Sequence, residues 1–137
     1  MAKVFTGRIT IPGDKIEDFL RLLAEGEKEK EPFRNQLNAL NVEFERYLLS
    51  KLSDRTARKH VGVIELFIDF LCRNTDIFKI EDITKGVVNT HFSQWYKRKV
   101  ISSSTPNDLK VALCKFFQFL ADEKGIINAK VLASLQK

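Results

Sequence analysis

Apolar residues recur at three- and four-residue intervals along most of the chain, and this spacing predicts helices rather than strands. In residues 35–50 the recurring positions are Leu37, Leu40, Phe44, Tyr47 and Leu48. A second predicted helix begins at Ser53 or Asp54 and carries a wide apolar stripe. The stripe consists of Ala57, Val61, Val63, Ile64, Phe67, Ile68, Phe70 and Leu71. Each face needs a partner, so the pattern predicts helices that pack around a shared core.

Three more helices complete the predicted bundle. The third begins at Thr84, and its inward positions are Val88, Phe92 and Trp95. The fourth has Pro106 in its first turn and stops at Gly125. Its inward positions are Leu109, Ala112, Leu113, Phe116, Phe117 and Leu120. A short last helix covers about residues 128–135, so we predict an all-α fold, a small bundle of four main helices with a short C-terminal helix.

The first residues of the chain show a weaker pattern. An alternating run at residues 8–12 predicts one short strand. Asp14 followed by Glu17 is typical of a helix N-cap with its reciprocal acidic partner, and it predicts a short helix over residues 15–24.

A polar segment separates this start from the bundle. Residues 25–32 alternate in charge and end at Pro32, where we expect the helix to break. The predicted organisation is therefore an N-terminal strand and helix extension, residues 1–34, to which the pattern assigns no role, and a helical domain, residues 35–137.

Two residue types qualify the picture of the core. Most of the 11 Phe residues occupy inward positions, which indicates an aromatic core rather than a platform for stacking bases. Gly62 lies inside the second helix, where glycine costs about 1 kcal/mol relative to alanine. Such a cost is tolerated most easily where another helix crosses closely, so we expect a crossing there.

Composition excludes several classes of protein. A chain of 137 residues suffices for one core, and no run approaches the roughly 18 apolar residues of a membrane span. We therefore expect a soluble, cytoplasmic protein. Cys72 and Cys114 lack Cys-x-x-Cys spacing and are better explained as buried core residues than as a zinc site or disulfide. His60 and His91 show no metal-ligand spacing, and we expect neither metal nor cofactor.

Positive charge gathers in the second part of the chain. The net charge is +5; residues 1–50 hold 8 basic and 9 acidic residues, whereas residues 51–137 hold 15 and 9. A basic excess of this kind favours a polyanion, either nucleic acid or an anionic membrane, without choosing between them.

The start of the second helix carries the most specific charge pattern. A helix N-terminus is partly positive, so stability favours acidic residues there. This helix instead opens with Arg55, Arg58 and Lys59, and only Asp54 opposes them. A helix cap does not require these cations. An anion bound to the backbone amides of the first turn would explain them.

The start of the fourth helix offers hydrogen-bonding side chains, namely Ser103, Ser104, Thr105 and Asn107, with Lys110 one turn later. Such groups bind phosphates and base edges in nucleic-acid complexes, but capping alone also explains the serines. The preceding Lys97, Arg98 and Lys99 end the third helix, where the dipole favours cations in any case. We expect the second and fourth helices to begin on the same side of the molecule.

The two helices also resemble each other. Windows 53–71 and 102–120 agree at Ser53/Ser102, Thr56/Thr105, Phe67/Phe116, Phe70/Phe119 and Leu71/Leu120. This agreement predicts the same kind of cap and the same kind of aromatic end in both helices.

These residues, with the intervening "DITKGVVNTHFSQWYKRKV", resemble the N-terminal core-binding domain of tyrosine recombinases and phage-type integrases. In that family a Leu-Ser-x-x-Thr turn precedes one helix, and a Ser-x-x-Thr turn precedes a later helix that ends in Phe-Phe-x-Phe-Leu. Both patterns occur here, the first from Leu52 to Thr56 and the second from Ser102 through residues 116–120. The resemblance covers about residues 35–136. It implies an orthogonal SAM-like helical bundle that clamps duplex DNA.

The family's catalytic domain uses a His-x-x-Arg motif and a Tyr nucleophile, and neither His60 nor His91 completes that motif. Tyr47 and Tyr96 lie within amphipathic helical patterns. The resemblance therefore implies a non-catalytic domain, either a fragment of a longer recombinase or a stand-alone relative.

The implied partners are double-stranded DNA, the catalytic domain of the same parent chain, and other recombinase protomers on DNA, with no membrane. The implied DNA-binding residues are Arg55, Thr56, Arg58, Lys59, Lys97, Arg98, Lys99, Ser103, Ser104, Thr105, Asn107 and Lys110. The alternative is a helical protein-interaction domain, an adaptor whose basic surface meets an acidic partner. An enzyme is disfavoured, because the sequence shows no paired carboxylates, phosphate-binding glycine loop or nucleophile-base pair.

Overall fold

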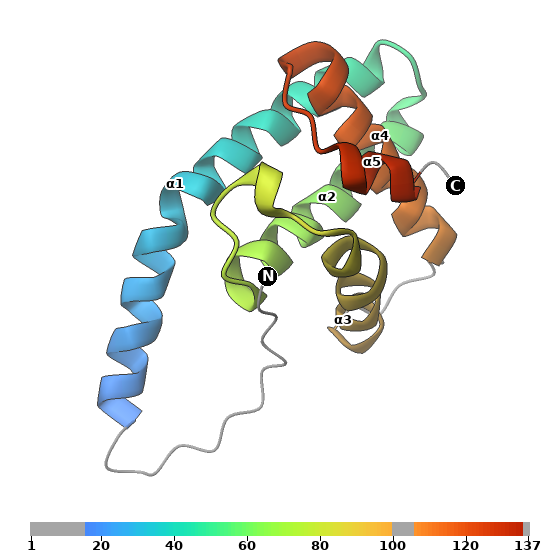
Figure 1. Ribbon diagram of the computed structural model, residues 1–137. Helices are drawn as coiled ribbons and strands as arrows, with labels where there is room; N and C mark the ends of the chain where they lie inside the picture. Colours follow the sequence, from blue (N-terminus) through green and yellow to red (C-terminus); the bar gives the residue numbers. More distant parts are fainter. Residues whose placement is uncertain (1–15, 100–105, 136–137) are drawn as a thin grey trace.

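The structure, a computed structural model, describes residues 16–99 and 106–135 (Figure 1). Within these ranges every element is helical, which confirms the predicted all-α class. The elements are α1 (Ile16–Leu49), α2 (Asp54–Asn74), the 3-10 turn η2 (Ile80–Asp82), the π-helical turn η3 (Val87–His91), α3 (Phe92–Lys99), α4 (Pro106–Lys124) and α5 (Ala129–Leu135). The strand predicted at residues 8–12 and the cap predicted at Asp14 lie outside the described residues.

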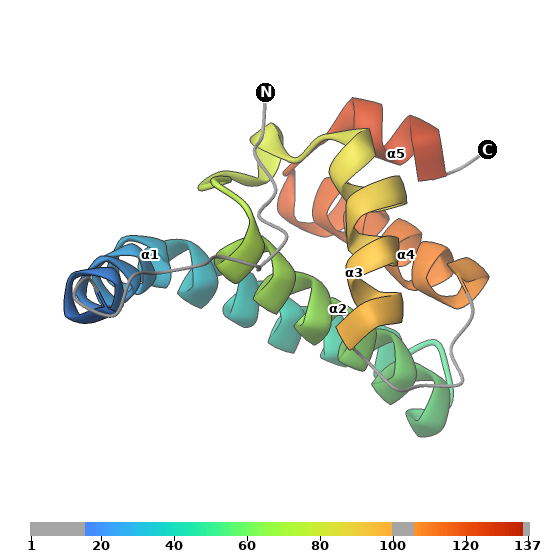
Figure 2. The same cartoon turned by 90° about the horizontal axis from the view of Figure 1, so that it is seen from below.

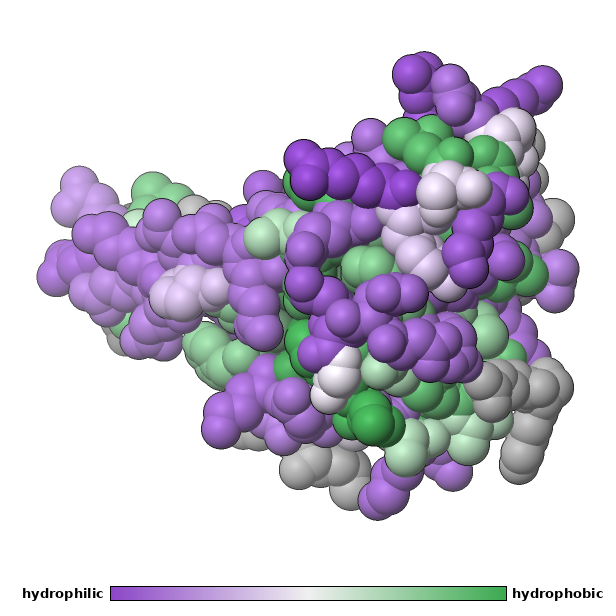
Figure 3. Space-filling view, turned by 90° about the horizontal axis from the view of Figure 1, so that it is seen from above, coloured by the Kyte–Doolittle hydropathy of each residue, from purple (hydrophilic) through white to green (hydrophobic). Residues whose placement is uncertain are grey.

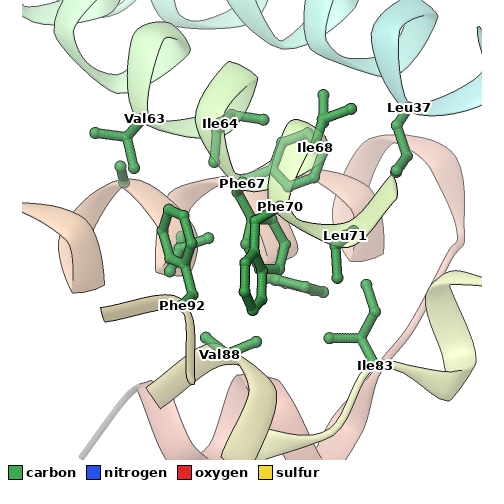
Figure 4. Close-up of a cluster of buried hydrophobic side chains, with 14 of the residues drawn as sticks. Leu37, Val63, Ile64, Phe67, Ile68, Phe70, Leu71, Ile83, Val88 and Phe92 are labelled. Atoms are coloured by element: carbon green, nitrogen blue, oxygen red, sulfur yellow. The ribbon is translucent and has the colours of Figure 1, made fainter. Parts of the chain in front are cut away.

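The core forms around α2, which packs against α1 on one side and against α3 and α4 on the other (Figure 2). The ring of Phe67 lies 5.0 Å from that of Phe92 and 6.3 Å from that of Phe117. Figure 4 shows the α2 side chains facing Phe92 and Val88 across this cluster. The aromatic stripes are therefore core, as predicted.

Burial follows the predicted inward positions closely. All of those positions on α2, α3 and α4 are buried, and so are Leu37, Leu40, Phe44 and Leu48 on α1. Tyr47 is only half-buried, because it lies at the edge of the core with its ring 5.1 Å from that of Phe119.

The predicted helix break at Pro32 is wrong. α1 is one helix of 34 residues with Pro32 inside it, so the predicted short helix and polar connector are parts of α1. Proline removes one backbone hydrogen bond of a helix and crowds the preceding turn. This bends the helix, and packing on either side of the bend keeps the helix from ending there. Figure 1 shows such a bend between the blue and cyan parts of α1. Phe33 and Leu37 are buried immediately after it, and this packing holds the helix together.

Lys30 shows why the polar segment is not a solvated connector. Its side chain is 6% exposed, and its Nζ donates to the carbonyl oxygens of Ile77 and, at 3.4 Å, of Leu71. The ammonium also lies 4.3 Å from the ring centroid of Phe78. Burial lowers the pKa of Lys30, because desolvation penalises the charged form. Lys30 therefore fastens α1 to the C-terminal end of α2, where the helix dipole favours a cation.

The predicted helix start at Thr84 and the predicted stop at Gly125 are confirmed. The hydroxyl of Thr84 accepts a hydrogen bond from the amide of Val87 at 3.2 Å. α4 ends before Gly125, whose φ of 68° lies in the left-handed region that favours glycine. The side chain of Asn128 accepts from the amide of Val131 and donates to the carbonyl of Ile83 at 2.9 Å, which joins α5 to the loop before η3.

Two expectations about single residues need correction. No other helix crosses closely at Gly62, where an added Cβ would meet no atom within 4 Å. Cys72 is buried as expected, but Cys114 is only half-buried, because it lies on the flank of α4 that lines a pocket with Lys51 and Gln118. The predicted division of the chain between residues 34 and 35 has no helix end to mark it, and it stays a prediction.

Replacement of Lys30 by alanine tests the anchor between α1 and α2. Lys30→Ala removes the donor to two buried carbonyl groups, and we expect it to lower the free energy of unfolding by about 2 kcal/mol. The matched control is Lys28→Ala, because Lys28 lies exposed in the same helix and should change stability by less than about 0.5 kcal/mol. Urea denaturation measures both, and equal effects of the two variants would contradict the anchor.

Candidate functional site

The start of α2 is built by a short hydrogen-bonded cap. The hydroxyl of Ser53 accepts from the amide of Thr56 at 3.3 Å and donates to the Thr56 hydroxyl at 2.9 Å. Because this cap fixes the first turn, Arg55, Arg58 and Lys59 leave the helix at defined positions, and all three are exposed. Thr56, predicted as a contact residue, thus also serves the cap.

An ion pair joins the starts of α2 and α4. The Nζ of Lys59 lies 3.4 Å from Oδ1 of Asp108, which is in the first turn of α4. Figures 1 and 2 show both helices beginning on the same side of the molecule. The prediction that they begin on the same side is confirmed. A half-exposed pair of this kind contributes at most about 1 kcal/mol, so its main significance is that it reports how close the two helix ends lie.

The remaining predicted residues of α4 lie on its other flank. Asn107 is exposed and Lys110 is half-buried, and both line a pocket of about 310 Å³ between α4, α3 and α5. Ser93 and Phe92 contribute the α3 side of this pocket. The start of α4 therefore contacts α2 through Asp108 on one flank and lines a pocket with α3 through Asn107 and Lys110 on the other.

The C-terminal end of α3 is also basic. Lys97 and Arg98 are exposed, and Arg98 Nε donates to the carbonyl of Gln94 at 3.4 Å. Six residues connect Lys99 to Pro106, so the two helix ends are no more than about 25 Å apart. Ser103, Ser104 and Thr105 lie outside the described residues, as does the side chain of Lys99, and their roles stay predictions.

Two cations and a histidine of this region were not predicted. His60 is buried on α2, and burial lowers its pKa; the neighbouring Lys115 and Lys59 lower it further, while Asp108 raises it. Lys51 lines a pocket with Lys115, and its Nζ lies 4.6 Å from the ring centroid of Tyr47. Lys115 follows Asp108 by two turns of α4, which places both residues on the same face of this helix. This spacing is the sequence feature from which Lys115 could have been predicted.

We use the name basic surface for the described residues Lys51, Arg55, Arg58, Lys59, Lys97, Arg98, Asn107, Lys110 and Lys115. Asp54 and Asp108 are the acidic residues in the first turns of its two helices. Cations therefore outnumber carboxylates at two helix N-termini that are already partly positive. Such an arrangement can hold an extended anion.

Other functional classes find little support in the part of the chain that the structure describes. There, no three His, Cys, Asp or Glu side chains come together in an arrangement that could hold a metal ion. None of its helices has the length and apolar character needed to cross a bilayer. Tyr96 is 6% exposed with its ring 6.0 Å from that of Phe92, so it is a packing residue.

Comparison with known proteins gave one match. Residues 42–124 match the family model of the phage integrase N-terminal SAM-like domain, which confirms the resemblance over that range. The range is more than half of the chain and includes α2, α3 and α4, and thus both basic helix starts. A search of curated proteins and a search of solved structures each returned no match.

The lowered pKa of His60 predicts how stability changes with pH. Above the unfolded-state value of about 6.5, His60 is neutral in both states. As the pH falls below that value the unfolded chain takes up a proton that the folded chain resists, so stability is lost toward acid. We expect wild type to lose more stability than His60→Gln between pH 7.5 and pH 5 in urea denaturation. Parallel profiles would contradict the lowered pKa.

Proposed function

The chain belongs to the phage integrase N-terminal SAM-like domain family, and we propose that it is a DNA-binding module that clamps one side of duplex DNA for integration or site-specific recombination. The matched part of that family is the N-terminal SAM-like domain and not the catalytic domain. The proposed partners are double-stranded DNA, a catalytic domain of the same parent chain and other protomers on the DNA. We expect the chain to act in the cytoplasm.

The observation that carries this proposal is the contact between Lys59 and Asp108. At this contact two helix N-termini meet, and each N-terminus carries partial positive charge. Phosphate groups bind well at such ends, especially beside guanidinium groups. Arg55 and Arg58 are exposed there, so one duplex could contact both helices at once.

The side chains of the basic surface suit two kinds of contact. Lys59 and Lys110 carry point charges at the ends of flexible chains, which suit phosphates. Arg55, Arg58 and Asn107 have planar groups that can form paired hydrogen bonds with guanine or adenine edges. We propose that the lysines position the duplex and that the planar groups read it.

An adaptor function draws on a different part of the molecule. Leu20 and Leu22 are 57% and 65% exposed on the first part of α1. Figure 3 shows this part of α1 extending to the left, mostly hydrophilic but with hydrophobic patches. These residues are remote from the basic surface, so an acidic protein bound to the basic surface would gain no apolar contact from them.

Salt dependence tests the positioning role. Replacement of Lys59 or Lys110 by alanine should weaken binding to every duplex alike and reduce the magnitude of the log–log salt slope by about 1. Arg73→Ala is the matched control, because Arg73 is exposed at the far end of α2 and pairs with Asp69 at 2.9 Å. Fluorescence anisotropy at several salt concentrations gives the slopes. If wild type shows no salt-dependent affinity for any duplex, the adaptor function replaces the proposal.

Sequence preference tests the reading role. Arg55→Ala, Arg58→Ala or Asn107→Ala should flatten preference at one base position more than it lowers overall affinity. The expected loss of discrimination is about 1–3 kcal/mol for a residue that touches a base. The measurement is competition between a cognate duplex and single-position variants, with Lys110→Ala as the comparison that should leave preference intact. Uniform weakening by all four variants would show that the surface binds phosphates only.

A further inference from the structure

Gly62 lies inside α2, on a side of this helix that no other element of the described ranges covers. It is partly exposed, and a Cβ added to it would meet no atom within 4 Å. Its backbone is helical, and the glycine with positive φ among the described residues is Gly125. Neither packing nor backbone conformation therefore requires glycine at this position.

Glycine is also unfavourable there. In a helix interior it loses more backbone freedom on folding than alanine does, so alanine would make α2 more stable. The reason for glycine must then lie outside the folded chain. Glycine is used where a backbone has to come close to a ligand, because it has no side chain to hold the ligand away.

The position of Gly62 points to the ligand. Arg55 and Arg58 precede it by seven and four residues, which places all three on one side of the helix. Beyond Gly62 the next exposed side chain on this side is the carboxylate of Glu65. Asp69, one turn further, is paired with Arg73 at 2.9 Å and with Arg34 at 3.4 Å. A polyanion lying along the basic part of this side would therefore end its contact near Gly62.

We propose that Gly62 is the point where one sugar–phosphate strand of a DNA duplex lies directly against the backbone of α2. The missing side chain lets the strand approach, while Arg55 and Arg58 bind phosphates on the N-terminal side of it. Glu65 repels the duplex from the following turn and sets the limit of the contact. This inference rests on the proposed DNA-binding function and adds a contact that charge alone does not reveal.

Stability and affinity should change in opposite directions at this position. Gly62→Ala should raise the midpoint of thermal unfolding by about 3 °C, because it favours the helix and fills open space. The same variant should weaken binding to a fluorescein-labelled duplex by about threefold to tenfold. Gly62→Gln, which has a longer neutral side chain, should weaken it further.

The matched control is Gly26→Ala in α1. Gly26 is also inside a helix, exposed, and free of any atom within 4 Å of an added Cβ, but it lies away from the basic surface. This variant should leave the dissociation constant of the duplex unchanged.

The outcomes separate the inference from the function on which it rests. If wild type and both Gly62 variants bind with equal, salt-dependent affinity, the role of Gly62 is overturned and the DNA-binding function stands. If wild type binds no duplex, both fail. If Gly62→Ala destabilises the fold, the open space at Gly62 is contradicted and the inference falls with it.

Discussion

The ring contacts of Phe67 determine where both basic helix ends lie. Phe67 packs 5.0 Å from Phe92 of α3 and 6.3 Å from Phe117 of α4, so it fixes how α2 crosses its neighbours. Phe67 follows Lys59 by eight residues, and Phe117 follows Asp108 by nine. At 1.5 Å per residue, Lys59 lies about 12 Å and Asp108 about 13.5 Å along their helices from the same crossing point. The contact between Lys59 and Asp108 is thus a consequence of core packing, and a weak surface ion pair does not have to supply it.

Two departures from helix-stabilising sequence occur on the exposed side of α2, and both lie in its first half. Arg55 and Arg58 are exposed near the N-terminus, where acidic residues would make the helix more stable. Gly62 occupies a position where alanine would make the helix more stable. The buried side of the same helix is apolar except at His60. Natural sequences usually break local rules at functional positions, so this contrast marks the surface independently of the family match.

The sequence predicted the helices that bury a regular stripe, because three- and four-residue periodicity reports burial directly. It could not predict that α1 continues through Pro32. The residues that hold α1 together there are anchored by distant groups: Lys30 donates to the carbonyl of Ile77, 47 positions away. Local propensity and charge gave the opposite answer, and tertiary contacts overrode them. The starts of α2 and α4 could be predicted, because each depends on its own residues. The pairing of Lys59 with Asp108 could not, because it depends on how the two helices cross, and no local pattern contains that information.

The anchor at Lys30 also bears on how the two candidate functions relate. It attaches α1 at the C-terminal end of α2, whereas the basic surface lies at the N-terminal end. With 21 residues, α2 is about 30 Å long, so its own length separates the two regions. Leu20 and Leu22 are exposed on the part of α1 that precedes Lys30, which extends away from the bundle (Figure 1). A protein bound to those leucines and a duplex bound to the basic surface would not compete for space.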